Sequence, residues 1–241
     1  MAKILVRIAI SIVVVVGLIY GAILLYTKVI NPPEDKLNED DLTAIVSDST
    51  AAPSTEVVAS SIPPAQESEI TGTWLATSDS TVGYRVKEVL GGVNTEGVGR
   101  TNQVNGSLTI QDSTVISTVF EIDVASIKSD SSKRDSQFTG NIMDVATYPT
   151  ATFRLLAPIE LGEIPIAGQK ITANVTGDLT LHGVTNQVSF EITATIDNGI
   201  IGVLGSIDIT FADYGIANPS NGFVTTGDTG LLEFVLAFEK G

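Results

Sequence analysis

Residues 188–196 read VSFEITATI, and this stretch decides the fold. Apolar side chains occupy every second position, and serine, glutamate and threonine fill the positions between them. A period of two is typical of a β-strand that buries one face and exposes the other. The residues that follow, Asp197-Asn198-Gly199, contain the Asn-Gly pair that favours a tight hairpin turn. We therefore predict an antiparallel sheet that contains this strand.

The same alternation recurs along residues 70–241. Seven further segments show it, four strongly and three weakly: 120–124, 171–181, 207–211 and 232–238, then 82–89, 104–110 and 152–157. A single sheet of about eight antiparallel strands would leave a large apolar face uncovered, so it must close into a barrel or fold into a sandwich. The interior of an eight-stranded barrel is filled by side chains or holds one small ligand. We expect an all-β domain.

One segment of this domain lacks the period of two. Residues 131–141 read SSKRDSQFTGN, which indicates a short helix or turn with Phe138 pointing inward. The charged cluster Lys133-Arg134-Asp135 in this segment is typical of a solvated surface.

The N-terminal region, residues 1–30, has the sequence features of a membrane anchor. Residues 8–26 form a run of 19 residues without a charge, and as a helix they would be roughly 28 Å long, about one hydrocarbon thickness. Lys3 and Arg7 precede the run, so the positive-inside rule keeps the N-terminus cytoplasmic and the remainder extracytoplasmic. A cleaved signal peptide would have a shorter apolar region and a small-residue cleavage site, so we favour an uncleaved single-pass anchor in the cell membrane. Gly17 and Gly21 form a G-x-x-x-G pair that could support a homodimer.

Residues 31–69 have the composition of a linker. They contain five of the nine prolines, nine acidic residues, one lysine, and neither glycine nor an aromatic residue. Such a segment cannot bury enough apolar surface to offset its loss of conformational entropy. We predict a disordered acidic tether with a reach of roughly 35 Å. The domains are then the anchor, 1–30, the linker, 31–69, and the barrel, 70–241.

The composition excludes several kinds of site. The chain has 241 residues and a formal net charge of -15, which argues against a nucleic-acid partner. It has no cysteine and one histidine, His182, which excludes disulfides, thiolate nucleophiles and zinc sites built on several such ligands. No G-x-S-x-G or calcium-loop spacing occurs. We expect no catalytic residue, no metal and no cofactor.

Three stretches occur together in a specific order. They are Trp74–Val86; then Ser126-Ile127, Arg134-Asp135 and Asp144–Phe153; then Gly177–Thr185. In order and spacing they resemble the YceI-like family of lipocalin-like, polyisoprenoid- or lipid-binding proteins. The resemblance implies an extracytoplasmic, eight-stranded antiparallel barrel around an elongated apolar cavity that holds a long isoprenoid or similar lipid. This chain departs from the family pattern at Ile142-Met143-Asp144, where relatives often carry Phe-Phe-Asp, and at Phe138, where a leucine is often found; its cavity length and mouth could therefore differ.

The candidate binding residues come from the inward faces of the predicted strands and from residues 131–141. The predicted cavity lining is Val82, Tyr84, Phe120, Ile122, Phe138, Phe153, Phe190, Ile192, Phe234 and Leu236. From the residues alone, the same side chains could equally fill a packed core; the resemblance favours a cavity. Contacts to an acidic head group could come from Arg85, Arg134, Arg154 and His182. The alternative for the arginines is surface ion pairing, and for His182 it is a hydrogen bond within a turn.

The predicted function is that of a membrane-anchored, extracytoplasmic lipid-binding protein that sequesters or carries a polyisoprenoid. Two other functions stay open. One is a rigid acidic scaffold for a partner protein, which requires a packed barrel. The other is a lipid-modifying enzyme, which requires a cluster of polar residues at one end of the cavity.

Overall fold

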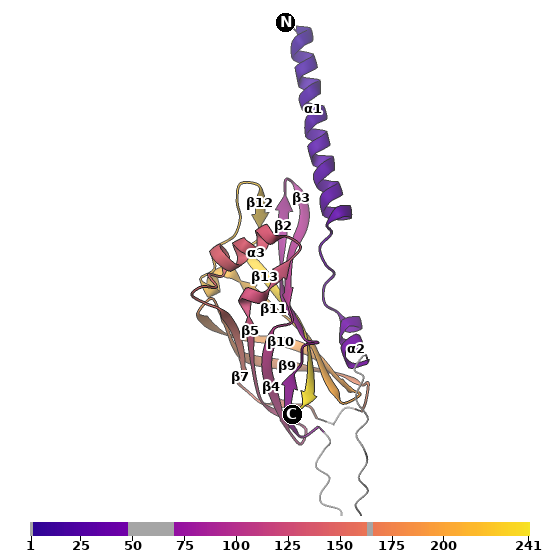
Figure 1. Cartoon of the computed structure of the whole chain (residues 1–241), viewed down its shortest axis with the longest axis vertical. Coiled ribbons are helices and arrows are strands. Elements are labelled where there is room, and N and C mark those ends of the chain that lie inside the picture. Colours follow the sequence, from indigo (N-terminus) through magenta and orange to yellow (C-terminus); the bar gives the residue numbers. More distant parts are fainter. Residues whose placement is uncertain (1, 48–69, 163–165) are drawn as a thin grey trace, which may run out of the picture.

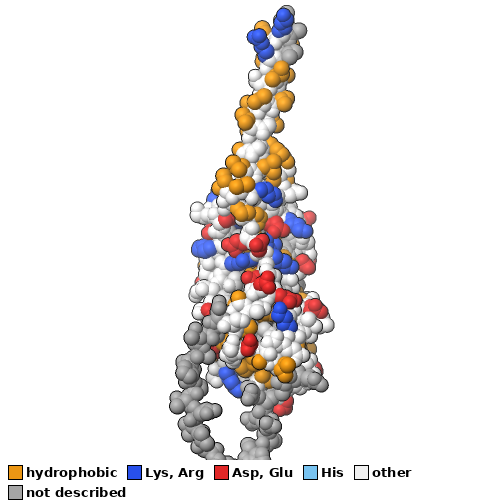
Figure 2. Space-filling view, turned by 90° about the vertical axis from the view of Figure 1, so that its right-hand side faces the viewer, with side chains coloured by type: hydrophobic (Ala, Val, Ile, Leu, Met, Phe, Trp, Pro, Cys, Tyr) orange, Lys and Arg blue, Asp and Glu red, His pale blue; other side chains and the backbone are white. Residues whose placement is uncertain are grey.

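A computed structural model describes residues 2–47, 70–162 and 166–241. Helix α1 (Ala2–Leu25) stands beyond one end of a β-barrel and continues as a π-helical turn, η1 (Tyr26–Ile30) (Figure 1). This helix, over residues 3–30, is long and apolar enough to cross a membrane, and an 18-residue stretch within it has a mean hydropathy of 2.9. Figure 2 shows its hydrophobic side chains exposed along its length. It has the properties of a membrane anchor or of a signal sequence.

The strands of the described residues form one antiparallel sheet. They are β1 (Gly72–Ala76), β2 (Thr81–Leu90), β3 (Val93–Thr101), β4 (Val104–Gln111), β5 (Thr114–Asp123), β6 (Lys128–Ser129), β7 (Thr150–Leu155), β8 (Ile159–Glu160), β9 (Lys170–Leu181), β10 (Val184–Asp197), β11 (Ile200–Thr210), β12 (Val224–Thr226) and β13 (Thr229–Lys240). Consecutive strands β1 and β2 both pair with β13, so together they act as one interrupted strand. In the same way β3 continues into β4, and β5 into β6.

These three composite strands and β7, β9, β10, β11 and β13 make eight strands around the barrel. The pairing of β1 with both β4 and β13 closes the ring. The prediction of an eight-stranded antiparallel barrel is therefore confirmed. The predicted Asp197-Asn198-Gly199 turn is also present: Asp197 pairs with Ile200, and Asn198 and Gly199 have φ angles of 48° and 76°. Left-handed φ values at both turn residues match the twist of the flanking strands.

The predicted short helix lies between β6 and β7. It consists of α3 (Ser132–Gln137) and a π-helical turn, η3 (Phe138–Ile142). The Ser131 side chain caps α3 by accepting a hydrogen bond from the Arg134 amide. Phe138 is buried and stacks on Tyr84 with ring centroids 4.7 Å apart, so the prediction that it points inward is confirmed. We call the barrel end that carries α3, β12 and the β2–β3 turn the upper end (Figure 1).

Part of the predicted linker is folded. Helix α2 (Glu39–Ser47) lies beside the barrel and packs on β10, β11 and β13 (Figure 1). Leu42 is fully buried, and its Cδ1 lies 2.8 Å from where a side-chain Cβ would stand at Gly202. The prediction of disorder differs from the structure here for two reasons. Leu42 and Val46 share one helix face that packs on the barrel, and the acidic residues at the start of the helix stabilise its first turn. Residues 48–69 of the predicted linker lie outside the described residues.

The chain between η1 and α2, residues 31–38, runs along the outer face of β2, β3 and β13; we call it the strap. Arg85 donates a hydrogen bond of 2.8 Å to the Glu34 carbonyl, and Arg100 donates to the Asp35 carbonyl. Both arginines also bind Glu233, whose side chain is only 1% exposed, at 3.2 Å and 2.7 Å. A buried carboxylate needs such paired cations, so the strap is held by the same charges that neutralise Glu233.

Candidate ligand-binding site

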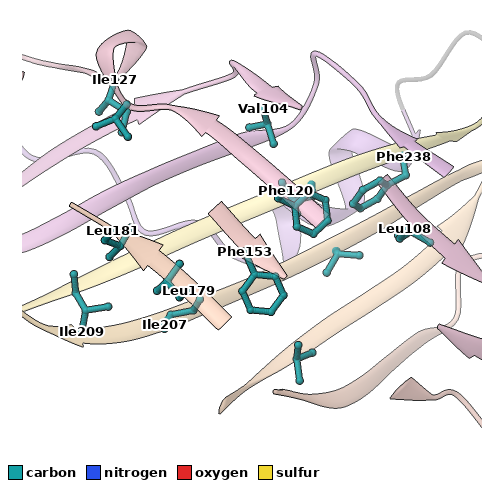
Figure 3. Packing of buried hydrophobic residues seen from close by; sticks show 14 of the residues in the cluster. Val104, Leu108, Phe120, Ile127, Phe153, Leu179, Leu181, Ile207, Ile209 and Phe238 are labelled. Atoms are coloured by element: carbon teal, nitrogen blue, oxygen red, sulfur yellow. The ribbon is translucent and has the colours of Figure 1, made fainter. Parts of the chain in front are cut away.

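The barrel encloses a cavity of about 330 Å³, a volume typical of small-molecule sites. Its wall is formed by the inward side chains of the strands and by Phe138 of η3. All ten side chains predicted to line a cavity lie on this wall: Val82, Tyr84, Phe120, Ile122, Phe138, Phe153, Phe190, Ile192, Phe234 and Leu236. Figure 3 shows Phe120 and Phe153 among the side chains of this interior. Contact of these residues with a ligand remains a prediction.

Glycines on neighbouring strands explain why so many aromatic rings leave an open lumen. A Cβ at Gly106 would lie 2.2 Å from the ring of Phe120, the residue with which Gly106 pairs across β4 and β5. Gly205 and Phe234 are related in the same way across β11 and β13, with a distance of 2.4 Å. Each ring therefore occupies the space over a glycine and lies against the wall instead of filling the centre.

Tyr84 and Phe153 follow the same rule. Tyr84 pairs with Gly99, where a Cβ would lie 2.5 Å from the tyrosine ring. Phe153 covers Gly177 of β9, where the corresponding distance is 2.3 Å. Sequence reasoning missed these glycines because the register between strands far apart in the chain decides which ring meets which glycine. The sequence signal that could reveal such contacts is a glycine at an inward position of an alternating segment.

Polar side chains gather at the upper end of the cavity. Glu88, Arg134 and Gln137 reach the wall from β2 and α3, and Asn221 and Thr226 reach it near β12. Arg134 forms ion pairs with Glu88, at 3.5 Å, and with Asp130. A binding site for an amphiphile needs an apolar lining and a few polar groups at one end, and this distribution provides both. Of the five, only Arg134 was among the predicted head-group contacts.

Tyr84 adds a neutral hydroxyl at this end. Burial raises the pKa of its phenol to about 12, and the nearby charge of Arg134 acts in the opposite direction. The phenol therefore keeps its proton at neutral pH and can act as a donor or an acceptor.

Arg85 and Arg154 lie outside the cavity, which corrects the expectation that they face a head group. Arg85 follows the inward Tyr84 on β2, so alternation turns it to the outer face, where it binds Glu233 and, at 2.6 Å, Glu96. These hydrogen bonds raise the pKa of Arg85 against the effect of burial. Arg154 follows the inward Phe153 on β7 and is exposed. Arg85 therefore forms ion pairs, as the alternative expected, but its pair with Glu233 is buried and does not lie on the surface.

His182 also lies away from the cavity wall. It occupies the turn between β9 and β10 with φ 50°, and its Nδ1 lies 3.3 Å from the carbonyl oxygen of Tyr214. Its ring meets the ring of Tyr148 edge-on, with centroids 4.6 Å apart. These contacts give His182 a structural role, but its hydrogen bond joins the β9–β10 turn to a separate segment at Tyr214 and does not lie within its own turn, as the alternative expected. Within the described residues no three His, Cys, Asp or Glu side chains gather as a metal site would require.

The cavity bears on the two other predicted functions. A rigid scaffold requires a packed barrel, whereas this barrel has an open interior. The polar upper end resembles what a lipid-modifying enzyme requires. The wall residues there include a glutamate and an arginine, and the wall as described contains no histidine or serine for a nucleophile–base pair.

The similarity to known proteins lies in the barrel. A family model described as a YceI-like domain matches residues 74–238. The chain is 40% identical over 74 residues to a UPF0312 protein of Pseudomonas putida (strain W619), a match that covers 30% of this chain and 35% of that protein. It is 33% identical over 106 residues to a UPF0312 protein of Pseudomonas syringae pv. tomato, covering 41% and 52%. The matches thus span about a third to a half of these relatives.

Two solved structures share the fold. A polyisoprenoid binding domain from Saccharophagus degradans, implicated in plant cell wall breakdown, superposes with a TM-score of 0.58 and 18% identity, over 71% of this chain and 99% of that domain. BcnA of Burkholderia cenocepacia superposes with a TM-score of 0.50 and 24% identity, over 64% and 95%. At these identities the likeness establishes the barrel architecture.

Proposed function

Because this chain belongs to the family of YceI-like domains, we propose that its barrel binds a polyisoprenoid or a similar long-chain lipid in the internal cavity. The observation that carries the proposal is the cavity itself. Its wall is apolar, and its polar side chains lie mainly at the upper end. The fold likeness to a polyisoprenoid binding domain supports the same ligand class.

The lipid would lie with its tail along the lumen and its head group near Arg134, Gln137 and Tyr84. Arg134 carries a positive charge close to the cavity wall, which suits a phosphate or another acidic head group. The Tyr84 hydroxyl stays protonated and can donate to the same group. The aromatic rings held over Gly106, Gly177 and Gly205 provide flat walls for an unbranched or methyl-branched tail.

The energetics suit a carrier or a buffer. Moving a tail from water into the barrel is worth about 0.8 kcal/mol per buried methylene. A bilayer already offers an apolar environment, so moving the tail from a membrane into the barrel gains far less. Exchange with a membrane would therefore be close to balance.

Helix α1 would anchor the protein in the cell membrane with the N-terminus in the cytoplasm and the barrel outside. Lys3 and Arg7 precede its uncharged run, which supports this orientation. The acidic barrel would stay near its lipid source through the anchor.

Native mass spectrometry of the full chain in detergent tests the proposal with polyprenyl phosphate as the probe. Ala194 lies on the cavity wall, so Ala194→Trp fills the lumen. Ala44 is exposed on α2, so Ala44→Trp makes the same change outside the barrel. We expect a one-lipid adduct with the unmodified chain and with Ala44→Trp, and its loss with Ala194→Trp. Equal adducts in all three proteins would overturn binding in the cavity.

A further inference from the structure

Two uncharged loops form the rim of the barrel at its upper end. Residues 89–95 comprise the ends of β2 and β3 and the turn between them, and residues 215–227 lead into and through β12. Neither segment contains a charged residue, in a chain with a net charge of -15. They are joined by a hydrogen bond of 3.3 Å from the Gly91 amide to the Phe223 carbonyl. Val89 and Phe223 are 37% and 62% exposed. An acidic protein that exposes apolar side chains on an uncharged rim has a surface suited to an apolar partner.

The same rim packs against α1. A Cβ at Gly91 would lie 2.6 Å from Cδ1 of Ile23 and 3.6 Å from the Phe223 ring, so glycine allows the turn to approach the helix closely. Gly92 lies near Tyr20 of the same helix. Thr27, in the η1 turn that continues α1, is buried. Figure 2 shows hydrophobic side chains gathered where the helix meets the barrel.

The strap fixes this arrangement. Only Asn31, Pro32 and Pro33 separate the end of η1 from Glu34, whose carbonyl oxygen is bound by Arg85 of the barrel. The Asn31 side chain also donates to Asp130, next to α3. So short a connection, with two prolines, cannot let the barrel move far from the end of the helix.

The position of the contact along α1 sets its depth. Lys28 is the first charged residue after the uncharged run, and a flanking lysine marks the membrane–water interface. Ile23 and Tyr20 precede it by five and eight residues, or roughly 8 and 12 Å along a helix. If Lys28 lies at the membrane–water interface, the rim that contacts Ile23 and Tyr20 lies deeper in the membrane than Lys28.

We propose that the β2–β3 turn and Phe223 insert into the membrane leaflet next to the barrel, so that the cavity opens directly onto that leaflet. The cavity reaches this rim, because Asn221 and Val224 line it. Glu88, Arg134 and Gln137 then stand at the level of the lipid head groups, and a tail slides between leaflet and lumen without crossing water. The route rests on the proposed lipid ligand, whereas insertion of the rim can be tested without it.

Depth-dependent quenching tests the insertion, because the chain has no cysteine of its own. Phe223→Cys, labelled with bimane, reports on the rim. Ile166→Cys is the matched control: Ile166 is also an exposed apolar residue, 74% exposed, and it precedes β9 at the opposite end of the barrel. The full chain is placed in phosphatidylcholine vesicles with and without phosphatidylcholine spin-labelled in the acyl chain. We expect quenching at position 223 and none at 166; no quenching at 223, or equal quenching at both, would overturn insertion.

A second variant separates this proposal from the proposed function. Phe223→Asp places a charge on the rim, so we expect it to slow the transfer of polyprenyl phosphate from donor vesicles while leaving the one-lipid adduct in detergent unchanged. An unchanged transfer rate would contradict entry through the rim. Absence of the adduct even in the unmodified chain would instead contradict lipid binding in the barrel.

Discussion

The ring of Phe234 on β13 occupies the space that a side chain at Gly205 on β11 would need. The two residues pair directly, and a Cβ at position 205 would lie 2.4 Å from Cζ of Phe234 and 3.1 Å from Ile192. Four such glycine–aromatic contacts hold rings against the barrel wall. The cavity exists because of these contacts as much as because of the apolar pattern.

Gly205→Val should close part of the lumen. The added side chain forces the Phe234 ring toward the centre, so we expect loss of the polyprenyl phosphate adduct and a destabilisation of about 1–3 kcal/mol from overpacking. Native mass spectrometry and urea unfolding measure the two effects. Gly140→Ala is the control, because a Cβ there meets nothing within 4 Å. Normal lipid binding by Gly205→Val would show that the ring does not shape the site.

Because of Tyr84, the free energy of unfolding should decrease at high pH. The phenol titrates near 10 when unfolded and at about 12 when folded. Between these values the folded chain keeps a proton that the unfolded chain has lost, so the free energy of unfolding decreases as the pH rises from 10 to 12. Absorbance at the tyrosinate band should show a late titration step that is smaller in Tyr84→Phe; burial also raises the pKa of Tyr214, which keeps part of the step. A late step of unchanged size in Tyr84→Phe would assign it to another tyrosine.

Glu233→Gln should loosen the strap. The change removes the charge that Arg85 and Arg100 share and leaves two cations facing each other on the barrel wall. Breaking a buried ion pair typically costs about 3–5 kcal/mol. We expect lower stability in urea and faster hydrogen exchange in residues 31–38.

The control for Glu233→Gln is Glu239→Gln, an exposed glutamate on the same strand. It should change stability by less than about 0.5 kcal/mol. Exchange in the strap that is equally slow in both variants would contradict the link between Glu233 and residues 31–38.

Leu42→Ala should detach α2. Leu42 is fully buried over Gly202, and truncating a buried leucine costs about 2–5 kcal/mol. A nine-residue helix has little stability of its own, so we expect rapid hydrogen exchange in α2 while the barrel stays folded. The control is the exposed Ala44→Gln. Unfolding of the whole barrel by Leu42→Ala would show that α2 is an integral part of the domain.

The barrel could be predicted from the sequence because alternation is a local property. Residues 188–196 and 232–238 set their inward faces without knowledge of their partners, and all ten predicted lining residues lie on the cavity wall. The same rule, applied to neighbours, would have placed Arg85 and Arg154 outside, since each follows an inward residue. The helix at residues 39–47 could not be predicted from the average composition of the linker, which hides the single apolar face formed by Leu42 and Val46.

The shape of the site could not be predicted in the same way. The contacts of Gly205 with Phe234 and of Gly106 with Phe120 depend on cross-strand register. The polar upper end brings together Glu88, Arg134 and Thr226, which are distant in sequence. Their meeting depends on how β2, α3 and β12 close one end of the barrel.

Photo-crosslinking of the full chain in lipid nanodiscs with a polyprenyl phosphate that carries a diazirine in its tail tests lipid binding in the barrel most directly. We expect labelled peptides from the inner wall, including Phe153 of β7 and Phe190 of β10, and their loss in Ala194→Trp. Labels confined to α1 and the outer surface of the barrel, unchanged in Ala194→Trp, would contradict a lipid held in the cavity.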